Sequence, residues 1–339
     1  MATIKDIASL AGVSRGTVDR VLNKRGGVHP ATRERVMEVA KALDYKPNKA
    51  GMVLSAQRKN LKIGVVMFGT NNPFFDDVRQ GLREAEDNLS SYNCEILVRS
   101  TPSVDNEDQI KAIDDLVRSG INALAIAPQN RDGVSKKIDE LFAAGIPTVT
   151  FNSDLPSSKR IAYVGSNYRK SGRTVAGLMK LIDHSGRLNV GVVGGLQSVL
   201  CHTERIEGFK DIADETPYMN VIDIVWSNDD DDHCYDVVSR LLNEHPEVNA
   251  IYFTAGAIEG GCKAIKALRR EDDILVIAHD KVPGTKALIE SGLIQATVCQ
   301  QPVIQGSLPL NILFEYLTTG EMPQTLNYTD IEIYIKENL

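Results

Sequence analysis

Two arginines near the start of the chain have a type and spacing that could read nucleic-acid bases. Arg15 and Arg20 lie in the segment S-R-G-T-V-D-R-V-L-N, whose apolar spacing predicts a short helix. On this helix Val18, Val21 and Leu22 would face inward, which leaves both arginines on the outer face. An arginine can donate two hydrogen bonds to O6 and N7 of guanine. The pattern therefore indicates base recognition in DNA, with a merely solvated helix face as the alternative.

The neighbours of the two arginines fit the same role. Ser14 and Thr17 could bind phosphates, which fixes the position of a protein on the duplex without reading its sequence. Gly16 has no side chain to contact a base, but it would let the helix approach the groove closely. The predicted DNA-contacting residues of this helix are Ser14, Arg15, Gly16, Thr17, Arg20 and Asn23.

Three short helices would position these residues. Thr3 can cap a first helix, which Gly12 ends. Ser14 can cap the second helix, and His29-Pro30 opens the third. The expected core residues are Ile4, Ile7, Ala8, Leu10, Ala11, Val18, Val21, Leu22, Val36, Val39, Ala40 and Leu43. A tight glycine turn between the first two helices is typical of a helix-turn-helix unit, whose second helix enters the DNA major groove.

The charge distribution separates this small unit from the rest of the chain. Residues 1–60 hold 12 Lys+Arg and 5 Asp+Glu, a net charge of +7. The whole chain holds 38 and 45, so the remaining residues hold 26 and 40, a net charge of −14. A basic unit joined to an acidic one indicates a polyanion partner for the first sixty residues only.

The segments T-I-K-D-I-A-S-L-A-G-V-S-R-G-T-V-D-R-V-L-N and T-R-E-R-V-M-E-V-A-K-A-L-D-Y-K-P-N closely resemble the DNA-binding part of the lactose/purine repressor (LacI) family. The resemblance implies a helix-turn-helix domain over residues 1–47, in which Arg15, Gly16 and Arg20 read bases. It also implies a hinge helix over residues 48–60 that forms on the operator, with Lys49 and Leu54 among its DNA contacts. Leu54 would wedge between base steps of the minor groove, unless it is an ordinary packing leucine.

The rest of the chain, residues 61–339, alternates strands and helices. Its short β-rich runs are K-I-G-V-V-M-F, E-I-L-V-R-S, A-L-A-I-A-P, P-T-V-T-F-N and I-A-Y-V-G-S, then N-V-G-V-V-G-G, V-I-D-I-V-W, A-I-Y-F-T-A, I-L-V-I-A-H and A-T-V-C-Q-Q. Two such series predict an α/β body of two doubly wound lobes with parallel sheets and a ligand cleft between them. The body also resembles the periplasmic sugar-binding-protein fold. We expect lobe 1 over about 61–165 plus 296–325, lobe 2 over about 166–295, and a C-terminal tail over 326–339.

Candidate effector-binding residues follow the predicted strands, because ligands of such folds bind at the carboxyl ends of the strands. Asn72 can cap the helix after the first strand, and Phe74 or Phe75 could stack on a sugar or be buried between helix and sheet. The resemblance implies effector contacts for Asn152, for Arg205 in H-T-E-R-I-E-G-F, for Asp280 and for Gln300. The full set is Asn72, Phe74, Phe75, Asn152, Arg205, Asp229, Asp280 and Gln300.

Other features bear on the kind of ligand. Ala255-Gly256 stands where sugar-binding relatives often place Asn-Asp, which leaves room for a bulkier or less hydroxylated ligand than a free pentose or hexose. The run N-D-D-D-D over residues 228–232 lacks the alternating pattern of a calcium loop, so a solvated loop is favoured. His202, His233 and the cysteines lack metal-ligand spacing. We expect no metal and no cofactor.

Three functional classes compete for this chain. V-V-G-G-L-Q-S follows a strand but matches no nucleotide-binding loop, so an enzyme is not favoured. A solute-binding transport protein would need an export signal and no basic head. Asp6 interrupts the apolar stretch that such a signal requires, so this class is not favoured either. A cytoplasmic, ligand-controlled transcription factor, most simply a repressor, accounts for head, hinge and cleft together. Its expected partners are a pseudo-palindromic operator in double-stranded DNA, a sugar or sugar derivative and a second copy of the chain, with no membrane.

Overall fold

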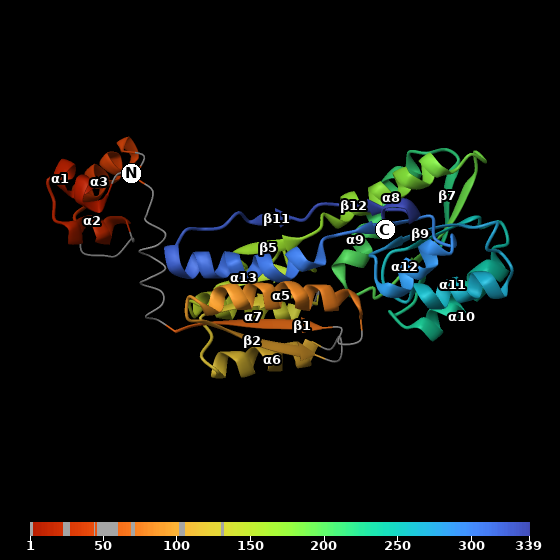
Figure 1. The fold of residues 1–339 in the computed structure, drawn as a ribbon, viewed down its shortest axis with the longest axis horizontal. Coiled ribbons are helices and arrows are strands. Elements are labelled where there is room, and N and C mark those ends of the chain that lie inside the picture. Colours follow the sequence, from red (N-terminus) through yellow and green to blue (C-terminus); the bar gives the residue numbers. More distant parts are fainter. Residues whose placement is uncertain are drawn as a thin grey trace.

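The structure is a computed structural model that describes residues 3–22, 28–43, 45, 60–68, 72–101, 106–129 and 132–339 (Figure 1). Three of the predicted DNA contacts, Asn23, Lys49 and Leu54, lie outside the described residues. Nearly all of the predicted hinge over residues 48–60 lies outside them as well.

The head consists of three short helices around a small core. They are α1 (Ile4–Ala11), α2 (Arg15–Leu22) and α3 (Pro30–Ala42). Thr3 caps α1, since its side chain accepts a hydrogen bond from the backbone N–H of Asp6, and Gly12 ends the helix at a φ of 63°. Ile7, Val18 and Val36 are fully buried where the helices meet. The predicted core is confirmed except at Leu10. The prediction for Leu10 is wrong, because this residue is 64% exposed.

The first lobe is a six-stranded sheet in the order β11-β5-β4-β3-β1-β2. Its strands are β1 (Leu61–Phe68), β2 (Cys94–Thr101), β3 (Ala123–Ile126), β4 (Thr148–Phe151), β5 (Ala162–Gly165) and β11 (Leu326–Tyr328). Its helices are α5 (Phe74–Ser90), α6 (Asn106–Arg118), α7 (Asp132–Ala143) and α13 (Pro302–Thr319). One face packs on α5 and α13 and the other on α6 and α7, so both faces of this parallel sheet are buried.

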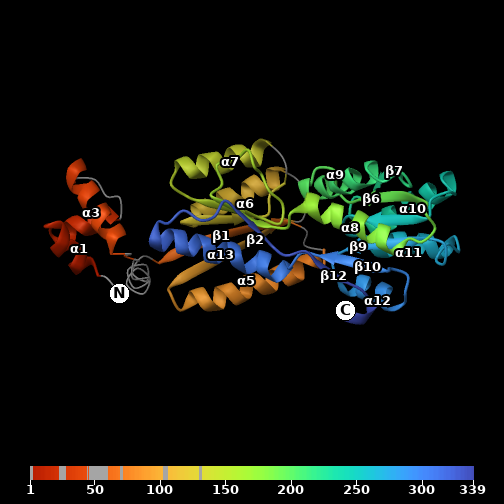
Figure 2. The same cartoon turned by 90° about the horizontal axis from the view of Figure 1, so that it is seen from above.

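The second lobe, which lies beside the first in Figure 2, is also a six-stranded sheet, in the order β12-β10-β9-β8-β6-β7, in which the edge strand β12 runs antiparallel to β10. Its strands are β6 (Leu188–Gly194), β7 (Met219–Trp226), β8 (Ala250–Phe253), β9 (Leu275–His279), β10 (Ala296–Cys299) and β12 (Glu332–Tyr334). Its helices are α8 (Tyr168–Ile182), α9 (Leu200–Asp214), α10 (Asp231–Glu244), α11 (Ile258–Ala267) and α12 (Pro283–Glu290), and a short 3₁₀ helix, η2 (Lys336–Asn338), follows β12. Helices α8 and α9 cover one face and α10 to α12 the other. The expected fold class, a helical head and a two-lobed α/β body, is confirmed.

The chain passes between the two sheets three times: after β5, after β10 and between β11 and β12. The expected place of residues 296–299 in the first lobe is wrong, because β10 pairs in parallel with β9 of the second sheet. A strand that follows its neighbour through one short helix, here α12, returns to the same sheet. Residues 326–339, expected as a separate C-terminal tail, instead contribute a strand to each lobe: β11 extends the first sheet and β12 the second.

Helices α8 and α9 approach each other closely through glycines. A Cβ atom on Gly172 of α8 would lie 1.9 Å from the carbonyl oxygen of Arg205 in α9. A Cβ on Gly208 of α9 would lie 1.9 Å from the carbonyl oxygen of Arg169 in α8. The two backbones are therefore in direct contact. This contact fixes the position of the Arg205 backbone in α9 relative to α8.

No helix within the described residues is long and apolar enough to cross a membrane. All five cysteines are free and buried, and the described residues contain no cluster of three or more His, Cys, Asp or Glu side chains that could hold a metal ion.

Candidate functional site

The outer face of α2 carries the predicted base-reading residues. Arg15, Gly16 and Arg20 are exposed, whereas Val18 and Val21 of the same helix are buried. The predicted division of the helix into a core face and an outer face is therefore confirmed, and contact with bases stays a prediction.

Ser14 begins α2 as a cap. Its Oγ accepts a hydrogen bond of 3.1 Å from the backbone N–H of Thr17, and the two hydroxyl oxygens lie 2.9 Å apart. The two predicted phosphate contacts are thus neighbours at the amino end of the helix, where the helix dipole also favours an anion.

Two of the predicted effector contacts leave their strands through left-handed turns. Asn152 directly follows β4 with a φ of 59°, and Asp280 directly follows β9 with a φ of 63°. Asn and Asp tolerate this backbone conformation better than other non-glycine residues. Because of the turn, each side chain no longer follows the alternating directions of the strand. Both residues lie at the carboxyl ends of their strands, where the two lobes meet.

A chain of side-chain amides joins the two lobes at this point. Asn152 Nδ2 donates to Gln305 Oε1 over 3.3 Å, and Gln305 Nε2 donates to Gln300 Oε1 over 3.1 Å. Gln300 Nε2 in turn donates to both carboxylate oxygens of Asp280, at 3.1 Å each. The structure therefore brings together three predicted site residues, and Gln305 is a fourth member that the sequence analysis missed.

Arg205 lies in the interior beside this chain, with only 2% of its surface exposed. Its Nη1 donates to the backbone oxygen of Thr254 over 2.6 Å, and its guanidinium lies 5.0 Å from the ring centre of Tyr168. Within the part of the chain that the structure describes, its Nε and Nη2 have no hydrogen-bond partner. Because an unpartnered buried charge is costly, these two donors are available for a ligand.

The charge on Asp280 responds to this environment. Burial raises the pKa of the Asp280 carboxyl, while the Arg205 guanidinium and the hydrogen bonds from Gln300 act in the opposite direction. Within the described residues Asp280 forms no ion pair within 4 Å, so Arg205 and Asp280 can each receive a separate polar group of a ligand.

Asp229 and Asn72 approach each other from opposite lobes. Asp229 Oδ1 accepts a hydrogen bond of 3.1 Å from the backbone N–H of Gly256. A Cβ on Gly256 would lie 3.4 Å from Asp229 Oδ1 and 3.7 Å from Asn72 Nδ2. The N-cap of α5 is Pro73 and not Asn72 as predicted, but Asn72 still bonds to the start of the helix, because its Oδ1 accepts from the backbone N–H of Phe74 over 3.0 Å.

Phe74 and Phe75 are packed in the core of the first lobe, with 6% and 2% of their surfaces exposed. Their rings meet edge to face, with centroids 5.3 Å apart. The structure thus agrees with the packing alternative, and stacking on a ligand stays a prediction. Val199 and Cys201 of the second lobe join the same apolar cluster, so the lobes also touch through apolar side chains.

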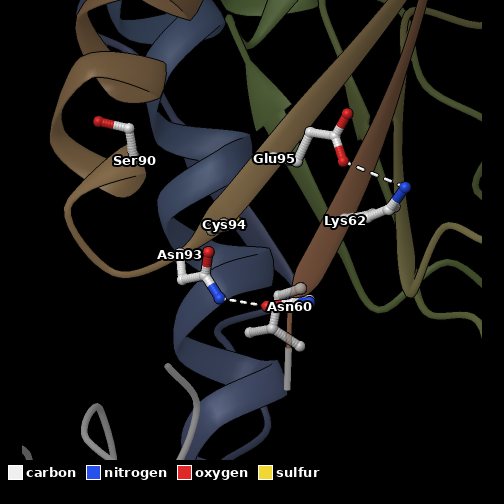
Figure 3. Close-up of a pocket in the computed structure, with 7 residues that line it drawn as sticks. Asn60, Lys62, Ser90, Asn93, Cys94 and Glu95 are labelled. Carbon is white, nitrogen blue, oxygen red and sulfur yellow. Dashed lines mark hydrogen bonds and ion pairs between the residues drawn. The ribbon is translucent and has the colours of Figure 1, made fainter. Parts of the chain in front are cut away.

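The hollow drawn in Figure 3 is a different place. Its lining residues are Asn60, Leu61, Lys62, Ser90, Asn93, Cys94 and Glu95, at the amino ends of β1 and β2. Lys62 Nζ lies 3.1 Å from Glu95 Oε2, so the charges of these two side chains are already paired. This hollow lies at the edge of the first sheet opposite to Asn152, and it contains none of the predicted effector residues.

A helix-turn-helix head and a two-lobed body with polar side chains gathered between the lobes define a ligand-responsive transcriptional regulator. Residues 63–322 match the model of the periplasmic binding protein domain, and residues 3–48 match that of the bacterial regulatory proteins of the lacI family. The chain belongs to the periplasmic binding protein domain family through its body, with a lacI-family DNA-binding head.

Two curated relatives named as regulators align with this chain over almost their whole length. The ribose operon repressor of Halalkalibacterium halodurans is 27% identical over 94% of this chain and 91% of its own length. Catabolite control protein A of Priestia megaterium is 26% identical over 93% of this chain and 92% of its own length. The crystal structure of a sugar-binding protein of a sugar ABC transporter from Bacillus halodurans superimposes with a TM-score of 0.73 at 26% identity, over 82% of this chain and 98% of that protein.

Proposed function

We propose that this regulator of carbohydrate metabolism binds a sugar or sugar derivative between its lobes and thereby changes its affinity for a DNA operator. The observation that carries the proposal is Arg205, a buried guanidinium with two unpartnered donors beside the Asp280 carboxylate. A hydroxylated ligand can accept from such donors and donate to such a carboxylate. The relatives named as repressors and sugar-binding proteins support this ligand class.

Contacts across the lobes supply the link from ligand to DNA. Asn72 faces Gly256, and the amide chain from Asn152 to Asp280 runs from one lobe to the other. The approach of Asn72 to Gly256 exists only when the lobes are together. A ligand that binds both lobes therefore favours this arrangement over an open one, which is the condition for shifting a conformational equilibrium.

A screen of sugars followed by two substitutions tests the ligand site. A bound ligand raises the melting temperature of the full chain by mass action, so D-ribose, D-allose, D-arabinose and related polyols can be compared directly. Arg205→Ala or Asp280→Ala should weaken binding by about 1.5–3 kcal/mol, because each removes a hydrogen bond made by a charged group. Arg169→Ala is the matched control, since Arg169 is exposed and pairs with Asp211 on the outside of the lobe.

The outcome separates a ligand site from a structural one. Arg205→Ala and Asp280→Ala should both retain effector-free DNA binding while they lose the ligand response. Unchanged ligand affinity in either variant, or an equal loss in Arg169→Ala, would contradict the assignment.

We also propose that the protein acts as a homodimer with one head on each half-site, since a single short head offers few contacts for tight specific binding. Selection from random DNA should return an inverted repeat, whereas a single asymmetric site would argue against the dimer. Arg15→Ala or Arg20→Ala should weaken operator binding by about 1–3 kcal/mol and relax the preference at one position of each half-site. The control is Arg35→Ala on α3, which should leave the sequence preference unchanged; uniform weakening by the α2 variants would mean phosphate contact instead.

A further inference from the structure

In the amide chain between the lobes, the charge of the Asp280 carboxylate determines which end of each amide donates and which accepts. An ionised carboxylate can only accept hydrogen bonds, so Gln300 must turn its NH₂ group toward Asp280. The Oε1 of Gln300 then faces Gln305, and the NH₂ group of Gln305 must donate a hydrogen bond to it. The Oε1 of Gln305 consequently faces Asn152 and accepts from its NH₂ group.

Gln305 is the residue that makes this chain continuous. It lies in the first turn of α13 and is fully buried. A second bond from its Nε2, to the backbone oxygen of Gln300 over 2.7 Å, holds the amide in place. Asn152 belongs to the first lobe and Asp280 to the second, so Gln305 connects the orientation of one side chain to the charge of the other.

We propose that Gln305 is a positioning residue: it holds Gln300 in the orientation that the Asp280 carboxylate requires and sets the orientation of Asn152, and so determines which hydrogen-bonding groups the effector meets. With one N–H of its amide engaged by Gln305, Asn152 keeps its Oδ1 as an acceptor and its second N–H as a donor. The site then offers acceptors at Asn152 and Asp280 and donors at Arg205.

This polarity narrows the effector class, an inference that rests on the proposed function. Hydroxyl groups can satisfy both acceptors and the Arg205 donors, because each hydroxyl donates and accepts. A carboxylate or phosphate placed against the Asp280 carboxylate would bring acceptor against acceptor and like charge against like charge. The charged and titratable groups that bear on Asp280 are Arg205, His202, Asp77, Tyr168 and Cys299, of which only Arg205 is a permanent cation. Neutral polyols and sugars should therefore bind more tightly than the corresponding uronates.

A ligand-free experiment tests the positioning role. In the full chain labelled with ¹³C at Asp carboxyls, the Asp280 signal is identified as the one missing from Asp280→Asn. Gln305→Leu should raise the pKa of Asp280, because Gln300 is no longer held in the orientation that stabilises the ionised form. Gln129→Leu is the matched control: Gln129 is another fully buried glutamine of the first lobe, and its side chain has no hydrogen-bond partner among the described residues. An unchanged Asp280 pKa in a folded Gln305→Leu protein would overturn the proposal.

If the leucine variant fails to fold, a second variant tests the proposal through the pH dependence of sugar affinity, which a loss of packing alone would not change. Gln305→Glu keeps the size of the side chain and can still accept from Asn152, but it can donate to Gln300 only when protonated. Its affinity for the neutral sugar that most stabilises the wild-type protein should approach the wild-type value as the pH falls through the pKa of the new carboxyl. Affinity that tracks the wild type at every pH would refute the positioning role.

The two experiments separate the possible failures. If no sugar stabilises the wild-type protein, the proposed ligand class is wrong, while the Asp280 titration still decides the role of Gln305. If a uronate binds as tightly as its parent sugar, the inferred polarity of the site is wrong.

Discussion

Replacing Gly172 by alanine should force helices α8 and α9 apart and weaken the second lobe. The added methyl carbon would lie 1.9 Å from the carbonyl oxygen of Arg205, 2.8 Å from its carbonyl carbon and 2.9 Å from the backbone nitrogen of Phe209. All three neighbours are backbone atoms, so no side chain can rotate away. The helices must separate by more than 1 Å to restore an ordinary contact, on the order of what carbon and oxygen radii require.

The magnitude follows from two opposing contributions. Overpacking of this kind destabilises a folded protein by about 1–3 kcal/mol. Alanine is better than glycine in a helix by up to about 1 kcal/mol, which offsets part of the loss. The same helix offers a matched control in Gly177, where an added Cβ would meet nothing within 4 Å. Gly177→Ala should therefore stabilise α8 by up to about 1 kcal/mol, and the two variants should differ by about 1–3 kcal/mol.

Denaturant unfolding of the full chain at one protein concentration measures this difference, and sugar binding measures its effect on the site. Because Arg205 leaves α9 at the point of contact with Gly172, Gly172→Ala should also weaken the ligand. Equal stability of the two variants would refute the close backbone contact, and unchanged ligand affinity in a destabilised Gly172→Ala protein would refute its role in placing Arg205.

Two further predictions concern buried charges. Burial first, and the Arg205 guanidinium second, hold the pKa of His279 well below its ordinary value of 6.5. The unfolded chain takes up this proton as the pH falls below about 6.5 and the folded chain does not, so stability should decline on acidification by up to about 1.4 kcal/mol per pH unit. His279→Gln should flatten that slope in thermal unfolding measured across this range; an unchanged slope would mean that His279 is not its source. Arg160→Met should destabilise the first lobe by about 3–5 kcal/mol, because it leaves the Asp154 carboxylate, 2.6 Å from Arg160 Nη2, buried without a cation. Adding Asp154→Asn should recover part of the loss, and failure to do so would point to lost packing instead.

The local elements of this protein could be predicted from the sequence. Thr3 and Ser14 cap their helices as their positions predict, and all ten predicted strands of the body form, with ends shifted by a few residues. Caps and apolar periodicity depend on residues within a few positions of each other, so the sequence holds the whole signal. The outward position of Arg15 and Arg20 follows from the same periodicity.

Only the tertiary structure decided how these elements are shared between the lobes. β10 joins the second sheet, while β11 and β12 add three residues each to different sheets. Strands this short have no periodicity to detect, and their pairing partners lie far away in the sequence. Leu10 likewise fits the apolar stripe of α1 but lies at its exposed edge, because the small head has too few neighbours to cover it.

The site divides in the same way between sequence and structure. The sequence alone determined that Asn152, Asp280 and Gln300 follow strands, and parallel strands bring such positions to one edge of a sheet. It did not reveal Gln305 or Tyr168, because a glutamine at the start of an apolar helix and a tyrosine at the start of α8 have no distinctive spacing. Their roles come from distances between side chains 5 to 153 positions apart, which the packing of the two lobes alone creates.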